Sequence, residues 1–81
     1  MDERTKKWLD SLKYIKKIDR IIEQSILGLY LGENWLDEDE LTYLVQRREK
    51  LTSKPFNCKK YPKFNEDYER MKRNGNENSG L

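Results

Sequence analysis

The sequence contains no histidine and only one cysteine, Cys58. Histidine is the most frequent general base and metal ligand in proteins, so the commonest catalytic and metal sites are excluded with it. One cysteine cannot form an intrachain disulfide, nor can it supply the several thiolates of a zinc site. We therefore expect no catalytic residue, no metal and no cofactor. A lone cysteine also fits a reducing compartment, which favours a cytoplasmic location.

Long hydrophobic runs are absent as well. The longest apolar stretch, residues 26–31, contains Gly28 and is far shorter than the roughly 20 residues of a membrane-spanning helix. The first ten residues, MDERTKKWLD, are charged throughout and lack the apolar run of a signal peptide. Hydrophobic residues make up 35% of the chain, and its mean hydropathy is −1.14. We expect no membrane contact.

Charge is abundant but balanced. Charged residues make up 40% of the chain, with 17 basic and 15 acidic side chains. A nearly neutral chain with clustered isoleucine, leucine and aromatic residues is not typical of a disordered protein, and it favours helices with charged outer faces. The length allows one small domain, which we place at residues 1–73. Residues 74–81 have no apolar side chain before Leu81 and are expected to form a disordered tail.

A long first helix is predicted from about residue 3 to residue 31. Apolar residues recur there at helical spacing, and no proline interrupts the pattern. The stripe consists of Trp8, Leu12, Ile15, Ile18, Ile22, Ile26 and Leu29. Toward its end the apolar surface nearly encircles the helix, so this end must be covered on most sides. Gly32 is expected to end the helix, because glycine accepts the left-handed conformation.

Four consecutive acids, residues 37–40, precede a second helix predicted at about 38–52. Asp37 has the position of an N-cap, and Glu40 lies three residues later, as in a capping box. The two acids between them place negative charge at the positive end of the helix dipole. The acidic run is therefore interpreted as a helix start rather than a site. The short loop before it predicts an antiparallel helical hairpin.

The chain changes character from Pro55 to Phe64, where prolines, aromatics and lysines follow no helical period. We expect this segment to lie extended across the hairpin. Asn65 is expected to cap a short third helix over residues 66–73, which Asn74 and Gly75 would end. The predicted fold is thus all-α: a helical hairpin, an extended segment and a short C-terminal helix.

A catalytic or metal-binding role explains the acidic run less well than a helix cap does. Adjacent helical residues point in different directions, so four consecutive carboxylates cannot converge on one ion. Catalysis by paired carboxylates needs a shared cleft, which a small hairpin hardly offers. Cys58 lies beside Lys59 and Lys60, but no histidine is present to activate it. We predict no enzyme activity and no small-molecule substrate.

Nucleic-acid binding is an alternative carried by residues 54–73. This segment holds seven basic and three acidic residues, with aromatic residues interleaved. Cationic groups for phosphates and aromatic faces for bases are the two requirements of single-strand binding. The same aromatic residues could instead fix the segment to the hairpin. The candidate residues are Lys59, Lys60, Tyr61, Lys63, Phe64, Arg70 and Arg73.

A protein partner is predicted from the apolar surface of residues 21–31. Two helices and a short third one cannot enclose this surface, and an exposed apolar remainder marks an interface. Self-association about a two-fold axis is one solution and predicts a homodimer, while a different protein supplying the missing layer is the other. Large aromatic residues are enriched at such interfaces. The candidate partner-binding residues are Trp8, Ile22, Ile26, Tyr30, Trp35, Leu36, Glu38, Asp39 and Tyr43.

The composition resembles that of small proteins from AT-rich bacteria and their phages, which are rich in lysine, asparagine, isoleucine and glutamate. Such proteins often bind and redirect a host protein, so the resemblance implies a regulatory interaction. Five acids within residues 33–40, around Trp35 and Leu36, suggest that the partner offers a basic groove, such as one that binds nucleic acid. The sequence therefore predicts a non-catalytic regulatory interaction protein.

Overall fold

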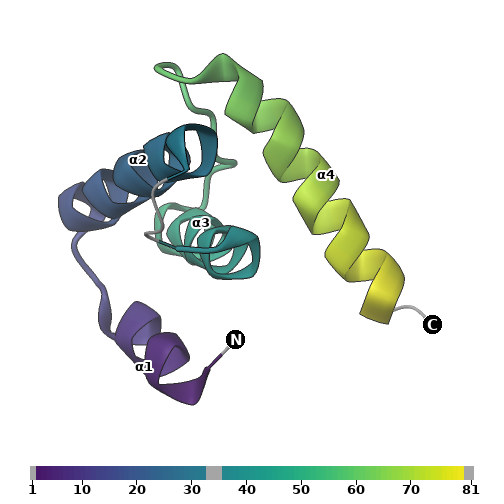
Figure 1. Cartoon of the computed structure of the whole chain (residues 1–81). Helices are drawn as coiled ribbons and strands as arrows, with labels where there is room; N and C mark the ends of the chain where they lie inside the picture. The colour runs from purple at the N-terminus through teal and green to yellow at the C-terminus, as the bar shows by residue number, and fades with distance from the viewer. Residues whose placement is uncertain (1, 33–35, 80–81) are drawn as a thin grey trace.

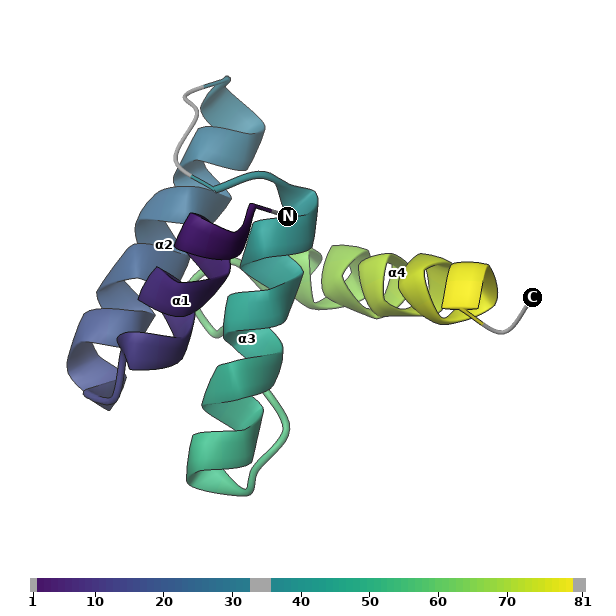
Figure 2. The same cartoon turned by 90° about the horizontal axis from the view of Figure 1, so that it is seen from below.

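The computed structural model describes residues 2–32 and 36–79, without the side chains of residues 74–79. The helices are α1 (Glu3–Ser11), α2 (Ile15–Leu31), α3 (Glu38–Thr52) and α4 (Pro62–Ser79). No strand occurs within these described residues. The all-α prediction is confirmed. The hairpin is confirmed as well, because α2 and α3 run antiparallel and pack side by side (Figure 2).

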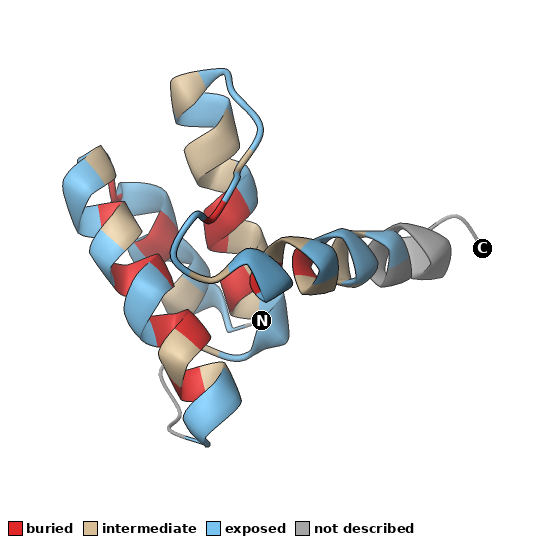
Figure 3. Cartoon of the chain, turned by 90° about the horizontal axis from the view of Figure 1, so that it is seen from above, coloured by how far each residue is buried: buried red, intermediate tan, exposed pale blue. Residues whose placement is uncertain are grey.

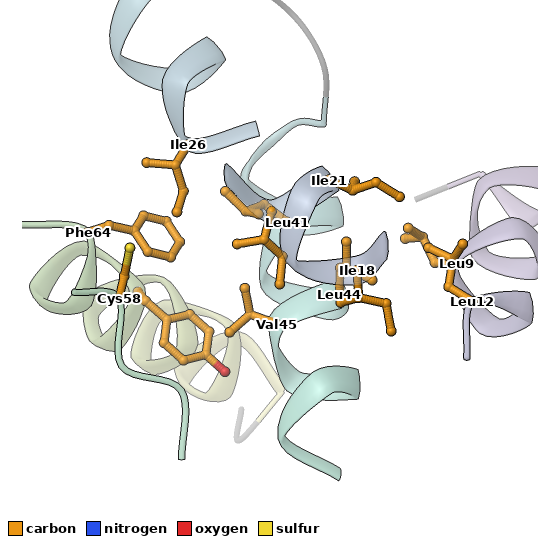
Figure 4. Close-up of a cluster of buried hydrophobic side chains, with 12 residues drawn as sticks. Leu9, Leu12, Ile18, Ile21, Ile26, Leu41, Leu44, Val45, Cys58 and Phe64 are labelled. Carbon is orange, nitrogen blue, oxygen red and sulfur yellow. The ribbon is translucent and has the colours of Figure 1, made fainter. Parts of the chain in front are cut away.

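The central helix is α3, which packs against each of the other three helices. α1 lies across one face of the α2–α3 hairpin, and α4 extends from another side (Figures 1 and 2). Figure 4 shows side chains of α3 between Leu9 of α1 and Phe64 of α4, so one continuous core joins all four helices. The α3 side chains that are completely buried are Leu41, Leu44 and Val45.

The predicted first helix is interrupted. Residues 12–14 are not helical, so the helix expected over residues 3–31 is divided into α1 and α2. At 1.5 Å per residue a straight helix of that length would measure about 44 Å, whereas α3 measures about 22 Å. The longest extent of the molecule is 36 Å. The break turns α1 back, so that Leu9 and Leu12 are buried instead of extending past the end of α3.

The polar groups at this break have partners. The N–H of Leu12 donates to the carbonyl of Leu9 at 3.2 Å. Arg47 of α3 donates from Nε to the carbonyl of Leu12, also at 3.2 Å. The apolar spacing could not reveal the break, because Leu12 and Ile15 are three residues apart whether or not the helix continues between them.

The boundaries of the hairpin follow the expected chemistry. α2 ends at Gly32, whose φ of +80° is left-handed. α3 begins with a capping box: the N–H of Glu40 donates to Asp37 Oδ1 at 2.8 Å, and the N–H of Asp37 donates to Glu40 Oε1 at 3.0 Å. The predictions that Gly32 ends one helix and that the acidic run begins the next are therefore confirmed.

Residues 53–61 contain no helix or strand and are held by side chains of α3 and α4. Glu49 of α3 accepts the N–H of Phe56 at 2.8 Å and the hydroxyl of Tyr68 at 2.6 Å. Asn65 of α4 accepts the N–H of Cys58 at 2.7 Å and donates to the carbonyl of Cys58 at 3.0 Å. Two polar side chains thus tie the segment to both neighbouring helices.

The last helix differs from the prediction at both ends. α4 begins at Pro62 rather than at residue 66, since proline is well tolerated in the first turn of a helix. Asn65 is therefore inside the helix and not at its cap. At the other end the helix continues past Arg73 to Ser79, through residues expected to belong to a disordered tail. A glycine such as Gly75 costs only about 1 kcal/mol inside a helix and does not force an end.

Most of the apolar surface of α2 is covered. Ile18, Ile21, Ile22 and Ile26 are at most 7% exposed, because α1 and α4 add cover that a hairpin alone would lack (Figure 3). The prediction of a largely uncovered surface treated α1 as a continuation of α2 and gave α4 only two turns. The large apolar side chains of α2 that remain exposed are Tyr30 and Leu31, at its end.

The capping box predicts different effects for two aspartates of the same run. Asp37→Ala removes a cap hydrogen bond and should lower the free energy of unfolding by about 1 kcal/mol. Asp39→Ala is the matched control, because Asp39 is exposed and takes no part in the capping box, so that it acts through the helix dipole, which salt screens. Urea denaturation in high salt should therefore separate the two variants. Equal losses of stability would contradict the role assigned to Asp37.

Candidate functional site

A cleft of about 400 Å³ opens between the end of α2, the start of α3 and one face of α4. It is lined by one aromatic, two apolar and four charged side chains, and the charges are of both signs. The lining residues are Leu29, Tyr30, Glu38, Lys63, Asp67, Arg70 and Met71. We call it the α2–α4 cleft. The cleft could not be predicted from the sequence, because its lining residues come from segments that are far apart in the chain.

Tyr30 is held at the edge of this cleft. Its hydroxyl donates to Asp67 of α4, which also accepts from Arg70 Nη2 at 2.6 Å. The Lys63 ammonium lies 5.8 Å from the centroid of the Tyr30 ring. Partial burial and the hydrogen bond to Asp67 raise the pKa of Tyr30 to about 12. The ring is nevertheless 42% exposed, so its outer face is available to a partner.

Part of the predicted partner-binding set comes together here. Tyr30 and Glu38 both line the α2–α4 cleft, and Asp39 is exposed next to Glu38. Leu31, which the sequence analysis did not select, is 70% exposed beside Tyr30. Leu36 is half-buried and packs against the core. Trp35 lies outside the described residues.

The other predicted partner-binding residues are placed differently. Ile22 and Ile26, which were expected at the surface, are core residues with at most 1% exposure, so a partner cannot contact them unless the core opens. Trp8 is 42% exposed on α1, which does not line the cleft. Tyr43 joins α3 to α1 by donating its hydroxyl to Asp10, and this hydrogen bond raises the pKa of Tyr43.

The aromatic residues of segment 54–73 serve mainly the core. Phe64 is fully buried, and its ring stacks on that of Tyr68 with centroids 6.1 Å apart. Phe56 packs edge-on against both rings. These rings cannot stack on a base without leaving the core. Tyr61 is half-buried, with the Lys60 ammonium 5.9 Å from its ring centroid.

Several basic residues of the same segment interact with groups of the chain itself. Lys60 lies 4.0 Å from the carboxylate of Glu23. Arg70 pairs with Asp67 in the rim of the α2–α4 cleft. Lys59 and Arg73 are exposed. Segment 54–73 therefore offers cations at its surface but keeps most of its aromatic faces inside.

Exposed charge is separated along the hairpin. Residues 24–46, at the loop end, contain five acids and no basic residue. At the opposite end, where α2 begins, four basic residues occur within residues 13–20, and none forms an ion pair in the described part of the chain. Asp19, which lies among them, pairs instead with Arg48 of α3. We call the four residues the basic end: they are Lys13, Lys16, Lys17 and Arg20.

The basic end opposes the usual distribution of charge along a helix. Lys16 and Lys17 lie in the first turn of α2, where the helix dipole is positive, and the N-cap Tyr14 forms no capping hydrogen bond through its side chain. A charge of the wrong sign there costs about 0.3–1 kcal/mol. α3 follows the rule, with acids first and Lys50 last. Helix stability therefore does not explain the basic end. The absence of acids from residues 11–18 was the available sequence signal.

Other kinds of site were sought over the described residues. There, no cluster of three or more cysteine and carboxylate side chains is arranged to hold a metal ion, and no helix is both long and apolar enough to cross a membrane. Cys58 is buried, and its Sγ accepts the N–H of Tyr61 at 3.3 Å. Comparison of the chain with known protein families, curated proteins and solved structures gave no match. Function is therefore inferred from geometry.

The tyrosines predict a loss of stability at alkaline pH. Burial, and then the hydrogen bond to Glu49, also raises the pKa of Tyr68, so Tyr30, Tyr43 and Tyr68 all keep their protons longer in the folded chain than in the unfolded one. The unfolded state loses these protons first, near pH 10. The free energy of unfolding should therefore fall as pH rises from about 10 to 12.

Urea denaturation at increasing pH measures this loss. Tyr30→Phe cannot ionise, so its stability should fall less steeply with pH than that of the parent chain. Lysine deprotonation in the same range affects both proteins equally and cancels in the comparison. Identical pH slopes for parent and variant would show that Tyr30 titrates alike in the folded and unfolded states.

Proposed function

We propose that the chain is a non-catalytic protein-interaction module with a regulatory role. It binds its partner through the loop end of the hairpin, where Tyr30 and Leu31 supply exposed apolar surface and Glu38 and Asp39 supply negative charge. We call these four residues the acidic docking surface. The observation that carries the proposal is that Tyr30 and Glu38 line one cleft, with the exposed Leu31 and Asp39 next to them in the sequence.

The apolar part of this surface fits an anchoring side chain of a partner. Leu31 is 70% exposed at the end of α2, and Tyr30 is hydrogen-bonded to Asp67. Rigid, partly exposed aromatic residues bind at low cost in conformational entropy and are enriched among residues that dominate interface energies. Leu29 and Met71 continue the apolar surface into the α2–α4 cleft.

The charged part selects the partner's chemistry. Asp37 and Glu40 use their carboxylates in the capping box, but Glu38 and Asp39 are exposed and take no part in it. Their charge is open to a basic partner surface, and complementary charge speeds association and gives specificity. We infer a partner with a basic groove beside an apolar pocket. A groove that normally receives nucleic acid has this character, and the chain would then regulate its partner by competing for that groove.

Self-association remains a prediction with a changed basis. It was predicted from an α2 surface too apolar for the chain to cover, but the isoleucines of this surface are buried. What supports a second copy now is Tyr30 and Leu31, a much smaller area. Light scattering at several protein concentrations distinguishes a homodimer from a monomer. A monomer leaves the proposal of a different partner protein intact.

Charge reversal tests the acidic docking surface. The double variant Glu38→Lys/Asp39→Lys keeps the capping box, so α3 should still form. Affinity for a partner captured from native lysate should fall at least tenfold, because lysines would now face a basic surface. The matched control is Glu66→Lys/Glu69→Lys, which makes the same change in net charge on α4 and should bind like the parent chain.

The apolar contribution is tested separately with Leu31→Ala. This side chain is mostly exposed, so the variant should keep its stability while losing affinity. Circular dichroism and urea denaturation verify that each variant is folded. Unchanged partner binding by both the charge-reversal and the Leu31 variants would rule out this surface.

A further inference from the structure

Two features that the proposed function does not use coincide where α2 begins. Tyr14, in the link between α1 and α2, is 78% exposed, more than any other large apolar or aromatic side chain in the described part of the chain. The basic end surrounds it in sequence, with Lys13 before it and three basic residues within the next six positions. An exposed ring and a group of exposed cations thus occur next to one another in the sequence where α2 begins.

The cations of α2 share one surface. They line a shallow hollow with an aliphatic side chain at its base, and the residues of this hollow are Lys16, Lys17, Arg20 and Ile21. The nearest acids in the sequence do not neutralise them. Asp10 accepts the hydroxyl of Tyr43 and Asp19 pairs with Arg48, so α3 engages both carboxylates, while Glu23, three residues after Arg20, lies 4.0 Å from Lys60. The positive charge is therefore open to a ligand.

We propose that the basic end, together with Tyr14, binds single-stranded nucleic acid. Lysine and arginine neutralise phosphates and release condensed counterions, and an exposed aromatic ring stacks on a base. The exposed Tyr14 ring favours a single strand over a duplex. The bases of a duplex are stacked inside it and offer no open base face to the ring. The hollow, which begins two residues after Tyr14 in the sequence, gives the strand a shallow seat.

Cations and aromatic rings also occur together in the sequence of segment 54–73, which was predicted, as an alternative, to bind nucleic acid. In the structure, however, the cations and the rings of that segment are separated. The rings of Phe64 and Tyr68 are buried in the core, while cations remain outside. Beside α2, both the ring and the cations are exposed. The proposed ligand is therefore still single-stranded nucleic acid, but its site is the basic end and not segment 54–73. This site is also independent of the acidic docking surface, which lies at the other end of the hairpin.

Fluorescence anisotropy with labelled oligonucleotides of about 12 nucleotides, single-stranded oligo(dT) and oligo(U), measures the affinity. A duplex of the same length is the comparison, and unlabelled polyglutamate of similar length is the competitor. Four phosphate contacts predict a log–log salt dependence with a slope of about −2.8, so that doubling the salt weakens binding about sevenfold. Single strands should bind more tightly than the duplex, and polyglutamate should compete poorly.

Two triple variants with equal charge change locate the site. K16Q/K17Q/R20Q should lose about a hundredfold in affinity near 0.1 M salt, and its salt slope should shrink by about 2. K59Q/K60Q/K63Q, on the alternative segment, should stay within about threefold of the parent chain. The first variant removes positive charge from the start of α2, so its melting temperature should be unchanged or higher. Unfolding therefore cannot explain its loss of binding.

Substitution of Tyr14 tests stacking. Tyr14→Ala should weaken single-strand binding about fivefold or more, while Tyr14→Phe keeps the ring and should bind like the parent chain. The proposal is overturned if no salt-sensitive binding occurs, or if the two triple variants lose equally. It is also overturned if Tyr14→Ala binds with the affinity of the parent chain and polyglutamate competes as well as oligonucleotide. The ligand would then be an acidic protein segment.

Discussion

The burial of α3 is the constraint on which the rest of the structure depends. The other three helices all pack on α3, and its completely buried side chains lie where the contributions of α1 and α4 to the core meet. A domain of this size has one small core and little stability to spare. The chain therefore uses its short central helix as a common support, and the break before α2 follows from it, because α1 must turn back to reach α3.

This arrangement also decides where binding chemistry can be placed. The polar side chains in the middle of the molecule are committed to holding elements together. Glu49 joins α3 to residues 53–61 and α4, while Arg47 and Arg48 join α3 to the start of α2. Within the hairpin, Tyr30 and Leu31 lie with the acids of α3 at one end, and Tyr14 lies with the basic end at the other. The candidate surfaces therefore lie at these ends rather than in a central cavity.

The sequence predicts what is local in the chain. The capping box of Asp37 and Glu40 and the left-handed Gly32 could be identified because their chemistry involves neighbours a few residues apart. The break at residues 12–14 could not, since it is stabilised by Arg47, which is distant in the sequence. Asn65 resembles a cap in the sequence, but it lies inside α4, which begins at Pro62, and its side chain hydrogen-bonds to the backbone of Cys58.

The candidate sites show the same difference between what is local in the chain and what depends on tertiary packing. The acidic residues at the start of α3 and the exposed Tyr30 were selected from the sequence, but Ile22 and Ile26 were assigned to a surface that α1 and α4 help to cover. Whether an aromatic residue faces solvent depends on tertiary packing. Phe64 and Tyr14 each lie beside lysines in the sequence, yet one is fully buried and the other is mostly exposed. Composition cannot distinguish them.

The two ends of the hairpin are far enough apart to act independently. The chain carries a formal net charge of +2, so neither end is dominated by a field from the whole molecule. At physiological ionic strength the interaction between exposed charges is largely screened beyond about 8 Å, whereas α2 alone is about 26 Å long. An anion at the basic end therefore feels the local lysines and not the distant acids. A partner at the acidic docking surface likewise meets negative charge that the basic end does not cancel. A nearly neutral chain can thus present two surfaces of opposite sign, and one ligand need not displace the other.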